Sequence, residues 1–400
     1  MAENKDKKVL NVPNLRFPEF EGEWEEHYLS DYLDFKNGLN PKPERFGKGI
    51  RFISVMDILN NAVITNDCIR ASVDVSEEEL LSFCVENGDI LFQRSSETLE
   101  DVGRANVYMD NKPAVFGGFV IRGKKKAEYN PLFFRYLLAS PFARKKIIPM
   151  GAGAQHFNIG QEGLNKVKLH FALLDEQKKI ARLLSLLDER IAIQNKIIED
   201  LKKLKYAIIE REYTFKVQTH SHIGDFIEQN SNRNKDNIIQ NVLSVSNRQG
   251  FIRQREQFED RSIASNDTSN YKIVTRNDFA FNPARINVGS IARLTTFEKG
   301  IVSPMYICFH TKNSILPEYL SFYFETKQFF SEIQKRLEGS VRQCLSYEGL
   351  CNIPFFPPVI EDQRRIGKRL FTLVQKFNLE MTFLEMLQKQ KTYLLRQMFI

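Results

Sequence analysis

The 400-residue sequence lacks the short motifs by which most enzyme and metal sites are recognised. It contains no G-x-G-x-x-G, no Walker loop, no H-E-x-x-H and no G-x-S-x-G. Its five cysteines are scattered and form no C-x-x-C, so neither a disulfide framework nor a structural zinc site is indicated. We therefore expect no catalytic residue, metal or cofactor in this chain.

Long hydrophobic runs are also missing. No run approaches the length of a membrane helix, and the first ten residues lack the apolar core of a signal peptide. We expect a soluble, cytoplasmic protein without a membrane partner. The length suggests two or three domains. The net charge of +7 fits an anionic partner such as nucleic acid, although many basic proteins bind none.

Two short stretches resemble known sites only in part. Asn282-Pro283-Ala284-Arg285 begins like the Asn-Pro-Pro-aromatic signature of amino-group methyltransferases, but the second proline and the aromatic residue are absent. The glycine-rich turn that binds the methyl donor is absent too, so we do not expect methyl transfer by this chain. His220-Ser221-His222 has no acidic or cysteine company and is interpreted as part of a linker.

Two stretches, from 175 to 212 and at the end of the chain, carry the pattern of paired helices. Apolar residues recur in alternating steps of four and three, which is the 3.5-residue period of a helix packed along a second helix. The predicted pairing residues are Ile180, Leu184, Leu187, Ile191, Ile198 and Leu201 in the first stretch, and Ile366, Leu370, Leu373, Phe377, Leu384 and Leu387 in the second.

The second stretch repeats the first at an offset of 186 residues, and the repeat extends upstream. Asn130-Pro131 aligns with Leu316-Pro317, and Gln177-Lys178-Lys179-Ile180 aligns with Gln363-Arg364-Arg365-Ile366. Further upstream, with a small change in length, Asp89-Ile90-Leu91-Phe92 pairs with Asp278-Phe279-Ala280-Phe281. A collinear series of this kind indicates a tandem duplication of a globular domain followed by a long helix.

Each globular part has the pattern of mixed helix and strand, so the predicted fold class is α+β. The expected boundaries are 1–172 and 214–358 for the globular parts, and 173–213 and 359–400 for the helices. Expected strands are Phe52–Val55, Ile90–Phe92, Ala105–Tyr108, Val115–Ile121, Asn241–Val245, Asp278–Phe281, Ser290–Leu294 and Ile301–Phe309; expected helices begin near Ser76, Pro131, Phe142, Pro317 and Phe329.

Polar loops follow equivalent strands of the two repeats. Arg, Gln, Asn and Ser at a strand exit are side chains that read base edges, Arg toward guanine and Gln or Asn toward adenine. The alternative is that they are surface residues or partners of carboxylates, and the recurrence of the loop makes this less attractive. The candidate DNA-binding residues in these loops are Gln93, Arg94, Ser95 and Arg104 in the first repeat, and Asn282, Arg285, Asn287, Ser290 and Arg293 in the second.

A second pair of loops lies at Gly151–Asn158 and Gly339–Gln343, where small residues permit close approach to a phosphate or groove. It adds the candidates Gln155, His156, Asn158, Arg342 and Gln343; a tight turn before a strand is an equally good interpretation. Lys124 and Lys125 belong to a basic run that would attract phosphate, although such runs are more often solvated turns.

A helix of about 35 residues is roughly 50 Å long. An antiparallel pair of such helices would relate the two globular parts by a pseudo-twofold axis, and the parts could occupy two separated DNA half-sites more than one turn of ~34–36 Å apart.

The whole layout resembles the specificity subunit of type I restriction–modification systems. The residues that carry the resemblance are Arg16-Phe17-Pro18-Glu19-Phe20 with Trp24, Gly88-Asp89-Ile90-Leu91, Glu176-Gln177-Lys178-Lys179-Ile180, and Asp362-Gln363-Arg364-Arg365-Ile366 after Pro357-Pro358. The chain departs from the family pattern at His170-Phe171-Ala172, where a proline pair is usual, and at Asp362, where Glu is usual.

The resemblance implies two target recognition domains, each reading one half of a bipartite, asymmetric sequence in double-stranded DNA. It implies that the helices form an antiparallel coiled coil that sets the spacer and docks two modification (methyltransferase) subunits. Those partners would hold S-adenosylmethionine, and restriction/translocase subunits with ATP and Mg would join them; this chain would be non-catalytic. The alternatives are a fused restriction–methylation enzyme and a coiled-coil scaffold that binds no DNA.

Overall fold

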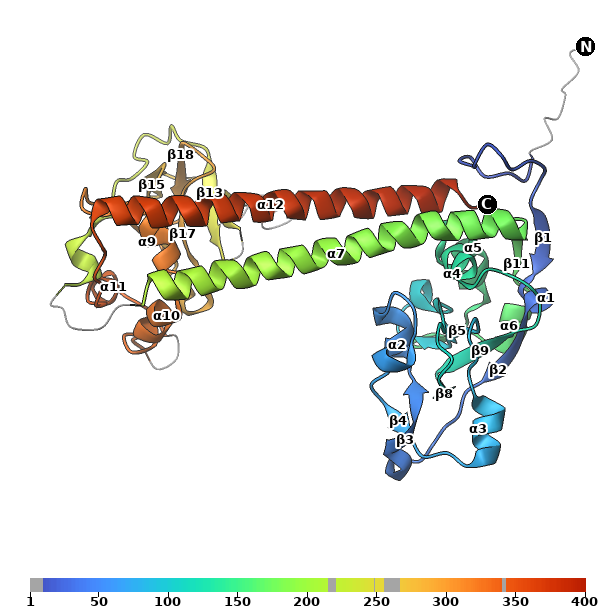
Figure 1. Ribbon diagram of the computed structural model, residues 1–400. Coiled ribbons are helices and arrows are strands. Elements are labelled where there is room, and N and C mark those ends of the chain that lie inside the picture. The colour runs from blue at the N-terminus through green and yellow to red at the C-terminus, as the bar shows by residue number, and fades with distance from the viewer. Residues whose placement is uncertain (1–9, 215–220, 248, 255–266, 340–342) are drawn as a thin grey trace, which may run out of the picture. The chain divides into compact units, whose positions relative to one another are not determined.

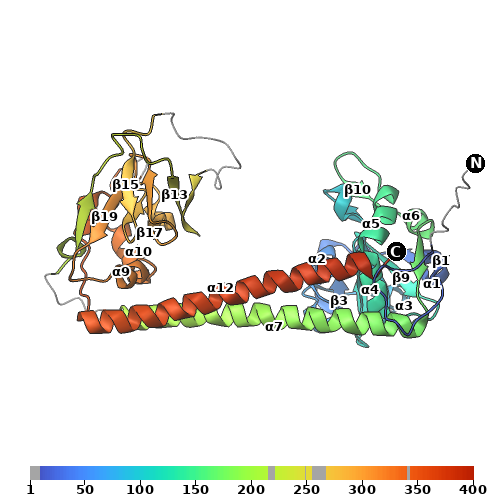
Figure 2. The same cartoon turned by 90° about the horizontal axis from the view of Figure 1, so that it is seen from above.

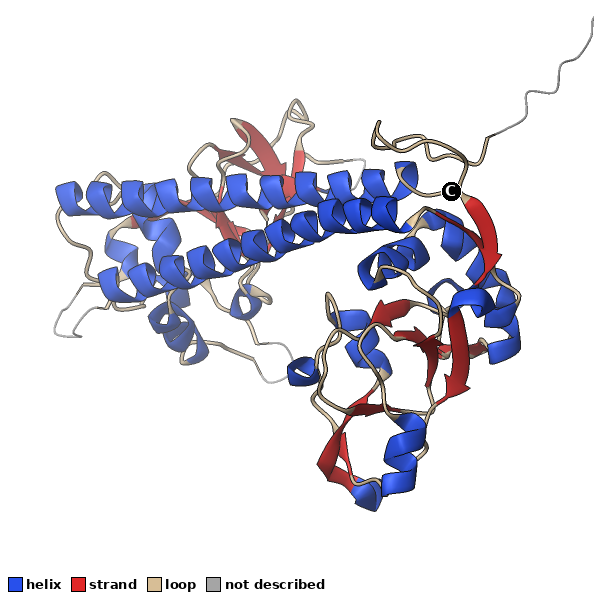
Figure 3. Ribbon diagram, turned by 45° about the vertical axis from the view of Figure 1, so that its right-hand side comes forward, coloured by secondary structure: helices blue, strands red, loops and turns tan. Residues whose placement is uncertain are grey.

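The computed structural model describes residues 10–214, 221–247, 249–254, 267–339 and 343–400. The chain forms two compact units: unit 1 is Met1–Asn195 with Thr382–Ile400, and unit 2 is Lys196–Met381. Each unit mixes helices and strands (Figure 3). Two long helices, α7 (Leu174–Glu212) and α12 (Ile360–Gln397), contribute one half to each unit.

Unit 1 is built on a four-stranded antiparallel sheet in the order β2-β9-β5-β7 and a three-stranded sheet in the order β4-β3-β8. The strands are β1 (Glu25–Tyr28), β2 (Leu33–Asn37), β3 (Phe46–Ile53), β4 (Ser72–Val73), β5 (Ile90–Gln93), β6 (Ser95–Ser96), β7 (Ala105–Val107), β8 (Ala114–Phe116), β9 (Val120–Lys125), β10 (Phe157–Asn158) and β11 (Lys168–Phe171). The helices are α1 (Leu29–Tyr32), α2 (Val55–Asn60), α3 (Glu77–Phe83), α4 (Pro131–Ala139), α5 (Pro141–Ile147) and α6 (Gln161–Asn165).

Unit 2 repeats this topology. Its antiparallel sheet has the order β12-β19-β16-β17, and its second sheet, β14-β13-β18-β15, contains the parallel pair β13–β18 that corresponds to β3–β8. The strands are β12 (Ile227–Asn230), β13 (Val242–Ser246), β14 (Gly250–Arg253), β15 (Lys272–Thr275), β16 (Phe279–Phe281), β17 (Ile291–Arg293), β18 (Lys299–Val302) and β19 (Ile307–Thr311); the shorter helices are α9 (Pro317–Tyr323), α10 (Lys327–Gln334) and α11 (Tyr347–Cys351). The predicted duplication of an α+β domain is confirmed.

The long helices pair in antiparallel fashion within each unit. In unit 1, Leu184 near the start of α7 shares a core with Leu394 near the end of α12, and Asp188 forms an ion pair with Lys391 of 2.5 Å. In unit 2, Ile208 near the end of α7 shares a core with Leu370 near the start of α12. The predicted pairing residues are buried, except for Ile191, Leu373 and Phe377, which are half-buried.

In unit 1, α4 and α5 lie between the antiparallel sheet and α7 (Figure 1). The core therefore runs from Phe92 of β5 through Phe133 of α4 to Leu184 of α7. Asn130 caps α4 by accepting from the Phe133 N–H at 2.9 Å, and Pro131 occupies the first turn, where its missing N–H costs nothing.

The repeated glutamine of the helix-start motif ties each long helix to its own domain. Gln177 is buried; its Oε1 accepts from the Asn130 N–H at 2.9 Å and its Nε2 donates to the Ala172 carbonyl at 2.9 Å. Gln363 accepts from the Leu316 N–H at 2.9 Å and donates to the Pro358 carbonyl at 2.8 Å. One side chain thus fixes the same joint in both units.

The opening segment closes unit 1 over the start of α7. Arg16 donates two hydrogen bonds of 2.8 Å to the buried carboxylate of Glu176, and the Trp24 indole N–H donates to the same carboxylate at 3.3 Å. Trp24 also packs edge-on against Phe399, just beyond α12. Asp362, at the matching place in unit 2, pairs instead with Arg365 on its own helix at 3.0 Å.

The structure differs from the sequence prediction at three strands. Val55 was expected in a strand but begins α2, because Ser54 and Asp57 form a capping box. The expected strands Val115–Ile121 and Ile301–Phe309 are each two strands separated by a turn. The turns are closed by hydrogen bonds from Val120 N–H to Gly117 O (2.8 Å) and from Tyr306 N–H to Ser303 O (3.0 Å).

Candidate nucleic-acid interface

In unit 1 the fold brings the two predicted loops together. β6 pairs with β10, so Ser95 lies opposite Asn158 and its hydroxyl donates to the Asn158 side-chain oxygen. The Ile159 N–H donates to the Arg94 carbonyl at 2.9 Å. Figure 2 shows β10 at the outer edge of unit 1. The strand-exit loop and the glycine-rich loop therefore form one surface, although more than fifty residues separate them.

Gln155 and His156 are exposed at the tip of the glycine-rich loop. Reciprocal hydrogen bonds of 2.9 and 2.8 Å between Ala152 and Asn158 close this loop. At Gly153 a Cβ would lie 1.9 Å from the His156 carbonyl oxygen, so only glycine fits there. The loop is a tight turn that also presents polar side chains to solvent.

Unit 2 contains the same pair of loops in contact. The Leu345 N–H donates to the Pro283 carbonyl at 3.0 Å, as Ile159 does to Arg94, and a Glu338–Cys344 bridge corresponds to the Ala152–Asn158 bridge. Gln343 and Arg285 are exposed, and Asn287 is half-buried. Arg342 lies outside the described residues.

Several predicted residues point inward and support the loops. Gln93 is buried, and its Nε2 donates to the Ser95 carbonyl at 2.9 Å. Ser290 is buried and donates to the Val245 carbonyl at 3.2 Å. Arg293 pairs with Glu318 on α9 at 2.5 Å. Asn282, in contrast, is only half-buried, and its Oδ1 accepts from the Ala284 N–H at 3.1 Å.

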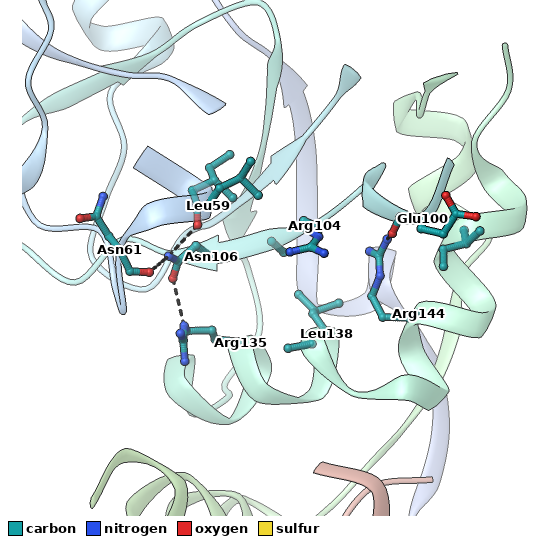
Figure 4. Close-up of a pocket in the computed structure, with 12 residues that line it drawn as sticks. Leu59, Asn61, Glu100, Arg104, Asn106, Arg135, Leu138 and Arg144 are labelled. Atoms are coloured by element: carbon teal, nitrogen blue, oxygen red, sulfur yellow. Dashed lines mark hydrogen bonds between the residues drawn. The ribbon is translucent and has the colours of Figure 1, made fainter. Parts of the chain in front are cut away.

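Arg104 lies on a separate pocket of about 390 Å³ in unit 1 (Figure 4). Arg135 and Arg144 also line it. Arg144 donates to the Glu100 and Val102 carbonyls at 2.8 and 2.6 Å, and burial, with Arg104 close by, lowers the pKa of Arg144 to about 10. Arg104 itself pairs with Asp101 at 2.5 Å. This concentration of guanidinium groups was not predicted, because Arg144 comes from a helix distant in sequence.

Lys124 and Lys125 lie apart from the joined loops. They end β9, whereas Val120 at the other end of β9 pairs with Gln93. Lys124 pairs with Glu86 at 2.8 Å, and Lys125 lies 3.8 Å from Glu128 and over the Tyr129 ring. Five residues of extended strand, or about 16 Å, separate the two ends.

Neither a metal centre nor a membrane segment emerges from the described ranges. Within them, no group of three or more His, Cys, Asp or Glu side chains is placed to hold a metal ion. The helices of the same ranges include none both long and apolar enough to cross a membrane. Both units contain a pair of joined polar loops, which lie where β5 ends in unit 1 and where β16 ends in unit 2.

Comparisons with known proteins agree with this architecture. Residues 21–203 match the family described as the type I restriction modification DNA specificity domain. A putative type I restriction enzyme MjaX specificity subunit of Methanocaldococcus jannaschii is 24% identical, and the match covers 96% of this chain and 94% of the relative.

Two solved structures share the fold. The S subunit of a type I restriction–modification system from M. genitalium superposes with a TM-score of 0.61 at 16% identity, over 97% of this chain and 99% of that one. A chain from a structure of the complex assembly and conformational transition of a type I R-M system gives a TM-score of 0.53 at 13% identity, over 93% and 96%. Over nearly its whole length the chain is therefore similar to specificity subunits of type I restriction–modification systems, and residues 21–203 resemble their DNA specificity domain.

Proposed function

We propose that each unit reads one half of a bipartite, asymmetric DNA sequence through its joined loops. The observation that carries this proposal is that both units contain the same loop arrangement with different side chains. Arg94, Ser95, Gln155, His156 and Asn158 would form the reading surface of unit 1. Asn282, Arg285, Asn287 and Gln343 would form that of unit 2.

The chemistry of these side chains suits base edges. Arginine donates two hydrogen bonds to guanine, and asparagine or glutamine exchanges two with adenine. The inward residues Gln93, Ser290 and Arg293 would hold the loops in position, which lowers the entropy lost on binding. The lysines are left out of the surface because they have carboxylate partners at the far end of β9. Because the two sets differ, the two half-sites should differ in sequence.

The remaining functions belong to partners in this proposal. The chain would be non-catalytic and would bind no cofactor. Two modification subunits carrying S-adenosylmethionine would dock on it, and restriction subunits using ATP and Mg would join them. The antiparallel helices would set the number of base pairs between the half-sites. Support comes from the pairing of α7 and α12 in each unit and from the similarity of the chain to specificity subunits.

A domain exchange tests the proposal. Residues 25–172 would be replaced by the equivalent part of a relative with a different, known half-site. Residues 10–24 are retained because Arg16 and Trp24 contact Glu176 and Phe399. We expect only one half of the methylated sequence to change. The reciprocal exchange of residues 221–358 should change only the other half, and alteration of both halves by either exchange would contradict modular reading.

A further inference from the structure

Phe119 and Met305 occupy the same position in the two units. Each is the third residue of a four-residue β-turn that leads from a strand of one sheet toward a strand of the other, and the two lie one repeat offset of 186 residues apart. The turn runs from Gly117 to Val120 in unit 1 and from Ser303 to Tyr306 in unit 2. A turn at this place thus belongs to the duplicated fold.

The turn itself gives no reason for an apolar side chain. Turn positions favour Gly, Asn, Asp and Ser, whose side chains are solvated or bond locally. Phe119 is nevertheless 68% exposed and Met305 61% exposed, although neighbours such as Phe116 and Val302 are fully buried. Single exposed apolar residues are common on protein surfaces. Equivalent ones in two diverged repeats, at the same turn, indicate a shared contact.

Both turns are attached to the reading loops. The Arg94 N–H donates to the Phe119 carbonyl at 2.9 Å, and Arg94 Nη1 donates to the Gly118 carbonyl at 3.3 Å. In unit 2, Asn282 Nδ2 lies 3.8 Å from the Met305 sulfur. Each turn therefore lies beside a residue that would read bases, and in unit 1 the backbone of the turn is held by two hydrogen bonds from Arg94.

We infer that Phe119 and Met305 are apolar DNA contacts that insert at a base step, one in each half-site. The inference rests on the proposed function. Phenylalanine and methionine are among the side chains that proteins use as wedges between base pairs. An unstacked step is easier to form at flexible sequences, so the wedge would add readout of DNA deformability to the hydrogen bonds of the loops.

The difference between the two residues has a predicted consequence. The flat ring of Phe119 can stack on one exposed base face, whereas the unbranched thioether of Met305 adapts its shape to the gap. Unit 1 should therefore depend more strongly on the identity of the base pair at its wedge than unit 2 does.

The test uses the full chain assembled with its modification subunits. The variants are F119S and M305S, the conservative variant F119L, and the controls L81S and I238S, which replace apolar residues that are also strongly exposed but lie outside the turns. Binding is measured with unmethylated duplex DNA that contains the recognised sequence. The fluorescent base 2-aminopurine is placed in turn at each half-site purine other than the adenine that is methylated. Wild-type methylation of a split motif is recorded in parallel.

We expect F119S to weaken binding about tenfold and to remove the fluorescence rise in the first half-site only, because one base–side-chain stack is lost. M305S should act on the second half-site, and F119L should retain most of the binding. The inference would be overturned if F119S and M305S had the same affinity and fluorescence as L81S and I238S. It would also be overturned if F119S and M305S weakened binding although the wild type showed no rise in fluorescence. If the wild type methylates a split motif, such a result leaves the proposed function standing; if it methylates none, the proposed function itself fails.

Discussion

Replacement of Gln177 by alanine should lower the free energy of unfolding of unit 1 by about 3 kcal/mol. The side chain is buried and makes one bond to the Asn130 N–H and one to the Ala172 carbonyl, each 2.9 Å long. The variant leaves both backbone groups without this partner inside the protein, and each such group costs about 1–3 kcal/mol. For a unit of this size the expected fall in Tm is about 6–12 °C.

The single tryptophan makes the assay specific for unit 1. Trp24 is buried against Phe133 and Phe399, so its fluorescence follows the unfolding of that unit alone. Urea titrations of wild type and Q177A, read by Trp24 fluorescence, give the difference directly. Q388A, on an exposed face of α12, is the matched control and should change the midpoint little.

The equivalent variant Q363A provides the second half of the test. Gln363 makes the same bonds at the joint of unit 2, so Q363A should lower the midpoint seen by circular dichroism and leave the Trp24 transition near that of the control. A Trp24 midpoint for Q177A equal to that of Q388A would refute the reasoning that this glutamine fixes the joint.

Three further predictions concern charge and length. The Arg45 guanidinium holds the pKa of Glu79 at about 2 instead of 4.5, so the stability that this carboxylate contributes is present above pH 4.5 and is lost as pH falls toward 2. E79Q should therefore be less stable than wild type at pH 7. A difference in stability at pH 2.5 equal to that at pH 7 would contradict this. R285A should reduce the salt dependence of DNA binding by about one phosphate contact or weaken binding to a single half-site. The double variant K124A/K125A should change neither property. A smaller salt dependence for K124A/K125A would show that the two lysines contact DNA. Insertion of one heptad between residues 195 and 196 and another between 381 and 382 keeps the apolar repeat and lengthens the helix pair by about 10 Å. The methylated motif should then gain about three base pairs between its halves. An unchanged gap would rule out that the helices set the spacing.

The duplication and the pairing of the long helices could be predicted because residues buried along one face of a helix are apolar and recur at a regular spacing in the sequence. Leu184 and Leu370 are apolar in both repeats since each lies at the contact between α7 and α12. Gln177 and Gln363 recur for another reason, namely the backbone groups that they pair at the start of each long helix. Patterns set by one helix face or one joint can be read without coordinates.

The merged strands show where such patterns mislead. The expected strands Val115–Ile121 and Ile301–Phe309 extend across their turns in part because Phe119 and Met305 are apolar, although both are exposed. The hydrophobic signal reports burial, and it fails at a residue whose exposure serves another purpose. The same conflict between local pattern and structure led to the inference that these residues contact DNA.

The joined loops could be predicted one at a time but not as a pair. β6 and β10 have two residues each, too few for a sequence pattern, and their pairing depends on the path of the chain through α4 and α5. The sequence also does not predict which of these side chains face solvent and which point inward. Arg285 is exposed while Arg293 pairs with Glu318, a difference that follows from the strand position of Arg293 and not from residue type.

The most direct test of the central claim is a map of DNA methylation. The chain would be expressed with its cognate modification subunit in a host without DNA methylation, and the modified adenines of the genome would be located by sequencing. We predict one split motif with two unlike halves around a fixed gap. A stable complex that methylates no motif, or only a continuous one, would contradict reading of separate half-sites by the two units.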